Sequence, residues 1–121
     1  MPKTAIKRFG ILTSGGDCPG LNAAIRGVAK AASSTYGMEV IGISNGYRGL
    51  IHGDARELHA ADFSNILTQG GTILGSSREK PFKNRYDPAL TDAEAGQDKP
   101  ELIKETIDRL GLDAIVTIGG N

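Results

Sequence analysis

One stretch, residues 9–22 (FGILTSGGDCPGLN), constrains the fold of this chain more than any other. Residues 9–12 form a short apolar run, which is typical of a buried strand. Gly15 and Gly16 follow, and they permit positive φ angles and a close approach of a ligand to the backbone. Pro19 then suits the first turn of a helix, where its missing N–H costs little. The stretch therefore predicts a strand, a glycine turn and the start of a helix.

The predicted helix carries its apolar residues on one face. They recur at intervals of three and four residues: Leu21, Ala24, Ile25, Val28, Ala29 and Ala32. A helix that begins directly after a glycine turn offers free N–H groups and the positive end of its dipole to an anion. We therefore expect phosphate binding at this turn. A tight turn that binds nothing is the alternative, because glycines serve packing as often as binding.

The turn matches neither of the two common phosphate-binding motifs. The pattern G-x-G-x-x-G is absent, and Leu21 and Asn22 stand where a P-loop has lysine followed by serine or threonine. A P-loop lysine and its magnesium-binding hydroxyl are therefore missing from this stretch.

The rest of the chain predicts an α/β fold with parallel strands. Residues 39–44 form a second apolar strand, and a strand, a helix and a strand within about 37 residues form a right-handed parallel unit. The further predicted elements are a loop over 45–53, a short strand over 54–59, a helix capped by Asp62 that continues to residue 68, a short strand over 72–74 and a helix over 100–110.

A second glycine turn ends the sequence. Residues 114–118 are a continuous apolar run, as in a central strand of a parallel sheet. Gly119, Gly120 and Asn121 follow it. Because the carboxyl ends of parallel strands share one edge of the sheet, where ligands bind, we expect this turn to lie beside Gly15.

Composition excludes several classes of function. The chain has 14 basic and 14 acidic residues, with no basic run, which argues against binding to nucleic acid or a membrane surface. Its single cysteine, Cys18, excludes an intrachain disulfide and fits a reducing compartment. No apolar run approaches the roughly 18 residues of a membrane span, and the N-terminus lacks the apolar segment of a signal peptide. We expect a cytoplasmic protein.

Four segments together resemble the 6-phosphofructokinase family and cover most of the chain. They are TSGGDCPGLNAAIRG (13–27), GISNGYRGL (42–50), QGGTILGSSR (69–78) and DAIVTIGGN (113–121). The resemblance implies a three-layer α/β sandwich with a mainly parallel, doubly wound sheet. Residues 1–121 would form its N-terminal nucleotide- and phosphate-binding part, a single unit of a larger domain.

The resemblance implies transfer of a phosphoryl group from ATP or pyrophosphate to the 1-hydroxyl of fructose 6-phosphate, with Mg²⁺ as cofactor. In this family the base that accepts the hydroxyl proton lies beyond the last glycine turn, so we expect these 121 residues alone to have no kinase activity. We also expect a homo-oligomer, because an unpaired sheet edge invites self-association. The alternatives are a non-catalytic phosphate- or nucleotide-binding fragment and a related NAD or diacylglycerol kinase.

The resemblance also assigns roles to particular residues. Gly16 and Arg78 would act in catalysis, with Arg78 contacting the transferred phosphoryl group. The residues that bind the phosphoryl donor would be Gly15, Gly16, Tyr47, Arg78, Glu79, Gly119, Gly120 and Asn121. Tyr47 would stack on the adenine, the alternative being packing within its own loop, and for Arg78 the alternative is a surface salt bridge.

Two departures from the family pattern concern the metal and regulation. Asn121, the expected metal ligand, stands where the family usually has aspartate; its carbonyl oxygen can coordinate Mg²⁺ but adds no negative charge. Arg26 and Lys30 match basic residues of an effector site in bacterial members. Ala60 stands where that site usually has an arginine, which argues against regulation by ADP or phosphoenolpyruvate.

Overall fold

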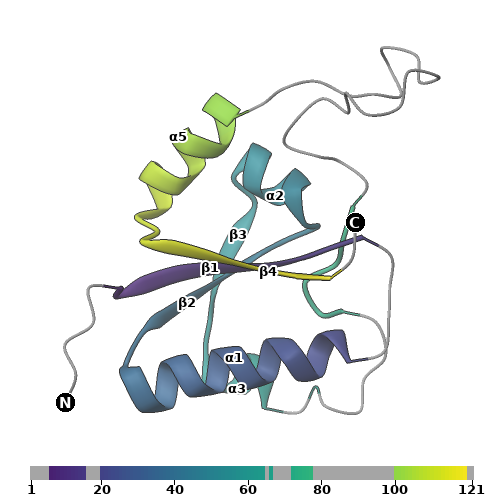
Figure 1. The fold of residues 1–121 in the computed structure, drawn as a ribbon, viewed down its shortest axis with the longest axis vertical. Helices are drawn as coiled ribbons and strands as arrows, with labels where there is room; N and C mark the ends of the chain where they lie inside the picture. Colours follow the sequence, from purple (N-terminus) through teal and green to yellow (C-terminus); the bar gives the residue numbers. More distant parts are fainter. Residues whose placement is uncertain (1–5, 16–19, 65, 67–71, 78–99, 120–121) are drawn as a thin grey trace.

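The computed structural model describes residues 6–15, 20–64, 66, 72–77 and 100–119. The elements in chain order are β1 (Arg8–Ser14), α1 (Leu21–Tyr36), β2 (Glu39–Ile43), α2 (Tyr47–His52), β3 (Ala55–Leu58), α3 (Ala60–Phe63), α5 (Pro100–Leu110) and β4 (Ala114–Gly119). A sheet in the order β3-β2-β1-β4 forms the middle layer. Helices α1 and α3 cover one face and α2 and α5 the other (Figure 1). The predicted three-layer α/β sandwich is confirmed.

The sheet is mainly parallel, as predicted. β1 pairs in parallel with both β2 and β4, whereas β2 pairs antiparallel with β3. The expectation that residues 114–118 form a central strand of the larger sheet stays a prediction, because within the described part of the chain β4 is an edge strand. Its side chains remain partly exposed. An apolar run indicates that both faces of a strand are suited to burial, but it does not report how many neighbours the strand has.

The core lies in two layers because the strand side chains alternate between the faces of the sheet. Facing α1 and α3, Phe9, Ile11 and Val40 pack against Ile25 and Ala29. The other layer, facing α2 and α5, is a cluster of Leu12, Ile41, Ile43, Leu50 and Leu112, called here the upper cluster. Within the described residues, no helix has the length and apolarity needed to cross a membrane.

Helix α2 corrects the prediction of a loop over residues 45–53. Leu50 and Ile51 are buried on the side of α2 that faces the core. Arg109 of α5 holds its far end, since its Nη2 donates a hydrogen bond to the Gly53 carbonyl over 3.1 Å. The helix has only six residues and two of its flanking positions are glycine, so no apolar period was visible in the sequence.

Helix α3 also differs from its prediction, in which Asp62 was the N-cap. The N-cap is His59, and Asp62 is the third helical residue. Its carboxylate accepts the backbone N–H of His59 over 2.8 Å, so the two residues form a reciprocal capping box. A carboxylate inside the first turn gives the same sequence signal as one just before it, which explains the three-residue error.

Asp113 fixes the start of β1 to the start of β4. Its carboxylate accepts the backbone N–H groups of Lys7 and Arg8 over 2.9 and 3.1 Å. Its own N–H donates to the Arg8 carbonyl over 2.8 Å. The hydrogen bonds from Lys7 and Arg8 hold the pKa of Asp113 below its ordinary value of 3.8.

We predict that this carboxylate stabilises the fold only while it is ionised. Because its pKa is lower in the folded state, the contribution is fully present above the unfolded value of 3.8 and is lost as the pH falls through the folded value. Asp113→Asn should therefore lower the free energy of unfolding at pH 7, and the difference from the parent should shrink below pH 3.8 in urea titrations at several pH values. A difference that stays constant down to pH 3 would contradict this.

Two glycines in helices make a matched pair for a test of packing. A Cβ on Gly49 would lie 1.9 Å from the backbone oxygen of Ser44, whereas a Cβ on Gly27 of α1 would meet nothing within 4 Å. Gly49→Ala should destabilise the protein by about 1–3 kcal/mol or more through overpacking. Gly27→Ala should stabilise it by about 0.5–1 kcal/mol, because alanine loses less backbone entropy in a helix. Thermal melts followed by circular dichroism would measure the stability of both variants. Equal changes in stability would contradict the packing argument.

Candidate functional site

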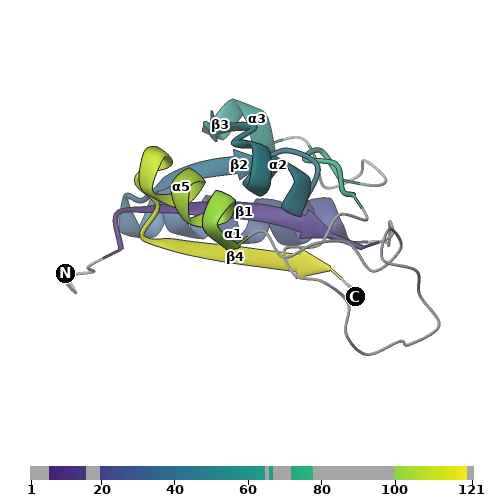
Figure 2. The same ribbon diagram turned by 90° about the horizontal axis from the view of Figure 1, so that it is seen from above.

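The carboxyl ends of β1 and β4 lie side by side at one edge of the sheet (Figure 2). Ser14, the last residue of β1, is in register with Gly119, the last residue of β4. Gly15 follows β1 directly with a φ of 87°. The prediction that the two glycine turns are neighbours is therefore confirmed for their described residues, Gly15 and Gly119.

Gly119 is required by the close approach of the two strands. Its φ is +132°, and a Cβ there would lie 2.1 Å from the backbone oxygen of Ser14. No other residue type fits this contact without moving one of the strands. Packing alone thus accounts for this glycine, and its part in ligand binding rests on the other features of the edge.

Residues 72–77 lie across the end of β1 and are held there by hydrogen bonds. Thr13, which is fully buried, donates from Oγ1 to the Gly75 carbonyl over 2.7 Å, and its Oγ1 lies 3.0 Å from Oγ1 of Thr72. From the end of β2, the backbone N–H of Asn45 donates to the Leu74 carbonyl over 2.8 Å. Two strand ends therefore fix this segment at the candidate site.

The predicted strand over residues 72–74 is not a strand in the structure. The N–H of Ile73 donates to the side-chain Oδ1 of Asn22 over 2.7 Å, and Asn22 is buried at the start of α1. Backbone groups that a strand would pair in a ladder are thus satisfied by the side-chain oxygen of Asn22 and by the backbone N–H of Asn45. The β-branched residues Thr72 and Ile73 gave the sequence its strand-like appearance.

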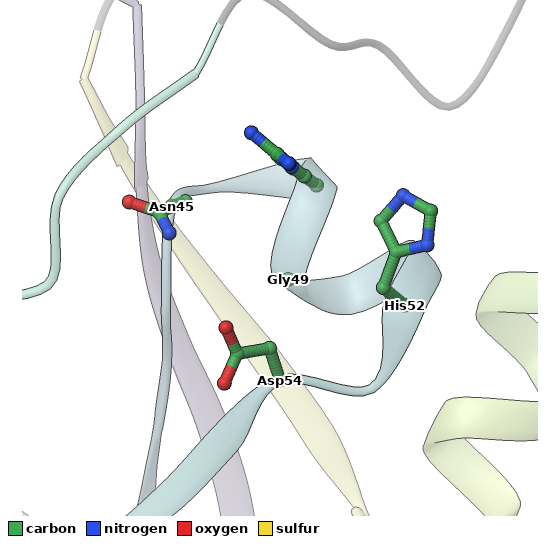
Figure 3. A pocket seen from close by; sticks show the side chains of 5 residues that line it. Asn45, Gly49, His52 and Asp54 are labelled. Carbon is green, nitrogen blue, oxygen red and sulfur yellow. The ribbon is translucent and has the colours of Figure 1, made fainter.

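A polar pocket of about 320 Å³ opens beside this edge. It is lined by Asn45, Arg48, Gly49, His52 and Asp54. Figure 3 shows Asn45 and His52 on opposite sides of it. Arg48 and His52 stand four residues apart in α2 and so share one face of that helix. No role can be assigned to Arg48 from the sequence alone, because this spacing has meaning only once residues 47–52 are known to be helical.

Comparison with known proteins identifies the family. The sequence model described as "Phosphofructokinase" matches residues 8–121. The chain belongs to the phosphofructokinase family. The alternative of a related NAD or diacylglycerol kinase is therefore set aside.

The sequences of individual relatives support this assignment. The chain is 65% identical over 121 residues to the ATP-dependent 6-phosphofructokinase of Spirochaeta thermophila, and this match covers all of the chain and 32% of that relative. It is 45% identical over 113 residues to the pyrophosphate–fructose 6-phosphate 1-phosphotransferase of Amycolatopsis mediterranei, covering 93% of the chain and 30% of that protein. The chain thus spans about a third of the length of these relatives.

The fold agrees as well. The crystal structure of Pichia pastoris phosphofructokinase in the T-state superposes with a TM-score of 0.77 at 35% identity, over 98% of this chain and 12% of that one. The doubly wound arrangement expected from the sequence is thus the arrangement of a phosphofructokinase.

Tyr47 begins α2, where it is half-buried and packs against the upper cluster. The alternative raised from the sequence was that Tyr47 packs only within its own loop. In the structure Tyr47 also packs against the core. The stacking of Tyr47 on adenine stays a prediction.

The other expected site residues lie outside the described part of the chain. They are Gly16, Arg78, Glu79, Gly120 and Asn121. Across the described residues, no three His, Cys, Asp or Glu side chains gather closely enough to hold a metal ion. The assignment of Asn121 as a metal ligand therefore stays a prediction.

A second, smaller pocket lies between α1 and α3. It has a volume of about 100 Å³, and Arg26, Lys30 and Ala60 are among the residues that line it. The structure thus brings together the three positions that the family resemblance connected with an effector. The neutral side chain of Ala60 leaves Arg26 and Lys30 as the basic residues of this lining.

We predict that Thr13 is the main anchor of residues 72–77. Thr13→Val keeps the shape of the side chain but removes its donor to Gly75, so it should lower the free energy of unfolding by about 1–3 kcal/mol. Thr117→Val, at an exposed position of the neighbouring strand β4, is the matched control and should change stability by less than about 0.5 kcal/mol. Urea unfolding measures both variants, and equal effects would show that the buried hydrogen bond is not the cause.

Proposed function

We propose that this chain forms the nucleotide- and phosphate-binding part of a 6-phosphofructokinase. The reaction is transfer of a phosphoryl group from ATP or pyrophosphate to the 1-hydroxyl of fructose 6-phosphate. The observation that supports the proposal is the register of Ser14 with Gly119, because Gly15 follows Ser14 and both glycines therefore lie at one edge of the sheet in a chain of this family. The names of relatives, one ATP-dependent and one pyrophosphate-dependent, support both donors.

The chemistry needs accurate placement of phosphates more than covalent help from the protein. Gly15 follows β1 and Gly119 ends the adjacent strand β4, and a bound polyphosphate can lie against the backbone of both glycines. Arg78 follows Ser77, the last described residue of the anchored segment, directly in the sequence. We therefore assign Arg78 to the transferred phosphoryl group, whose oxygens suit the planar fork of its guanidinium.

We further propose Mg²⁺ as the cofactor, with Asn121 as one of its oxygen ligands. Mg²⁺ is commonly held by one or two protein oxygens together with substrate phosphates. When bound, the ion would neutralise charge on the phosphates.

The proposal extends to assembly and location. We propose that the protein works as a homo-oligomer, as its resemblance to the family implies. A glycolytic enzyme of this kind belongs in the cytoplasm, where its sugar phosphate substrate is made.

A coupled assay for fructose 1,6-bisphosphate tests the proposal, with ATP and pyrophosphate supplied separately. We predict turnover with one of the two donors by the longest reading frame that contains this sequence, and none by the 121-residue chain. Arg78→Ala should lower kcat by about 10³-fold, as the loss of an arginine at a transferred phosphoryl group does elsewhere.

The results of this assay distinguish the proposed kinase from the alternatives. Binding of a donor without turnover by the longest chain would favour a non-catalytic binding protein. Turnover by the 121-residue chain would mean that a base lies within it. A loss of less than tenfold in Arg78→Ala would remove that arginine from the mechanism.

A further inference from the structure

Ser77 carries a buried hydroxyl with no partner. Its Oγ is shielded from solvent and makes no hydrogen bond in the structure. A buried hydroxyl loses its hydrogen bonds to water, and this costs free energy when no protein group replaces them. Such a group therefore needs an explanation. It lies at the end of the segment anchored across the end of β1, at the edge of the sheet where Gly15 and Gly119 lie.

The neighbours of Ser77 place it between the ends of two strands. A Cβ built on Gly46, which follows β2, would lie 3.4 Å from the backbone nitrogen of Ser77 and 3.7 Å from its Oγ. The same Cβ would lie 2.8 Å from the backbone oxygen of Thr13 in β1. Ser77 therefore sits where β1 gives way to the turn at Gly15.

The polar groups around Ser77 already have partners. Oγ1 of Thr13 bonds to the Gly75 carbonyl and to Thr72. The N–H of Asn45 is given to the Leu74 carbonyl. These bonds involve Thr72, Leu74 and Gly75, whereas the hydroxyl of Ser77 is left without a partner at the end of the segment.

We propose that the hydroxyl of Ser77 donates a hydrogen bond to a phosphate oxygen of the bound substrate, which makes Ser77 a further binding residue of this site. A serine hydroxyl can donate a hydrogen bond, and a charged phosphate oxygen is a strong acceptor for it. The inference rests on the proposed function, because it takes the ligand at this edge to be a phosphate. The phosphate belongs either to the donor or to the sugar, and the chemistry is the same for both.

The substitution Ser77→Ala tests the inference, because it should leave the stability of the ligand-free protein unchanged or higher and should lower the affinity for the ligand. It removes an unpaired buried hydroxyl, so the melting temperature of the ligand-free protein should stay the same or rise. It also removes a donor to a charged group, so the affinity for the phosphate ligand should fall about tenfold or more. A serine that only supports the fold would show the reverse: a lower melting temperature and little change in affinity.

The experiment uses the longest reading frame that contains this sequence. Calorimetric titrations with ATP, with pyrophosphate and with fructose 6-phosphate are run on the parent, on Ser77→Ala and on the control Ser76→Ala, which removes a hydroxyl one residue earlier. We expect Ser77→Ala alone to weaken binding. Weaker binding of ATP or pyrophosphate assigns the contact to the donor, and weaker binding of fructose 6-phosphate assigns it to the sugar phosphate.

Any other result contradicts either the inference about Ser77 or the proposed function. If the parent binds these ligands and Ser77→Ala binds them equally well, the inference about Ser77 fails and the proposed function stands. A fall in the melting temperature of ligand-free Ser77→Ala would show that the hydroxyl has a partner within the protein. If the parent binds none of the three ligands, the proposed function fails together with the inference.

Discussion

The central position of β1 is the constraint on which the rest of the structure depends. β1 pairs in parallel with a strand on each side, and its side chains are buried on both faces of the sheet. Because the strands run in the same direction, their carboxyl ends and the loops that follow meet at one edge. Every described feature of the candidate site, from Gly15 to Gly119, is placed there by this pairing.

The same stretch of sequence also organises a loop that lies far away along the chain. Thr13 at the end of β1 and Asn22 at the start of α1 bind residues 72–77 through side-chain hydrogen bonds. Both side chains are almost fully buried, where a satisfied polar network confines the backbone to one arrangement and an unsatisfied one would be costly. Residues 9–22 thus provide a glycine turn and also position the segment that leads to Arg78.

The sequence predicted the long elements well and the short ones poorly. The apolar face of α1 recurs from Leu21 to Ala32, and Gly37 ends that helix in the left-handed conformation. Six residues of α2 and four of α3 are too few to establish a period. Residues 72–74 have the composition of a strand but take their hydrogen bonds from Asn22 and Asn45, and such long-range contacts leave no local pattern.

Glycines at strand ends are weaker evidence for a ligand than they appear in the sequence. Gly119 is required by the backbone oxygen of Ser14, and Gly46, which follows β2, by the backbone oxygen of Thr13. Each of these contacts would exist with nothing bound, so packing explains the residue type. The hydroxyl of Ser77 is different in kind, because folding buries it without giving it a partner. A group that the fold leaves unsatisfied points to a ligand more directly than a residue that the fold itself requires.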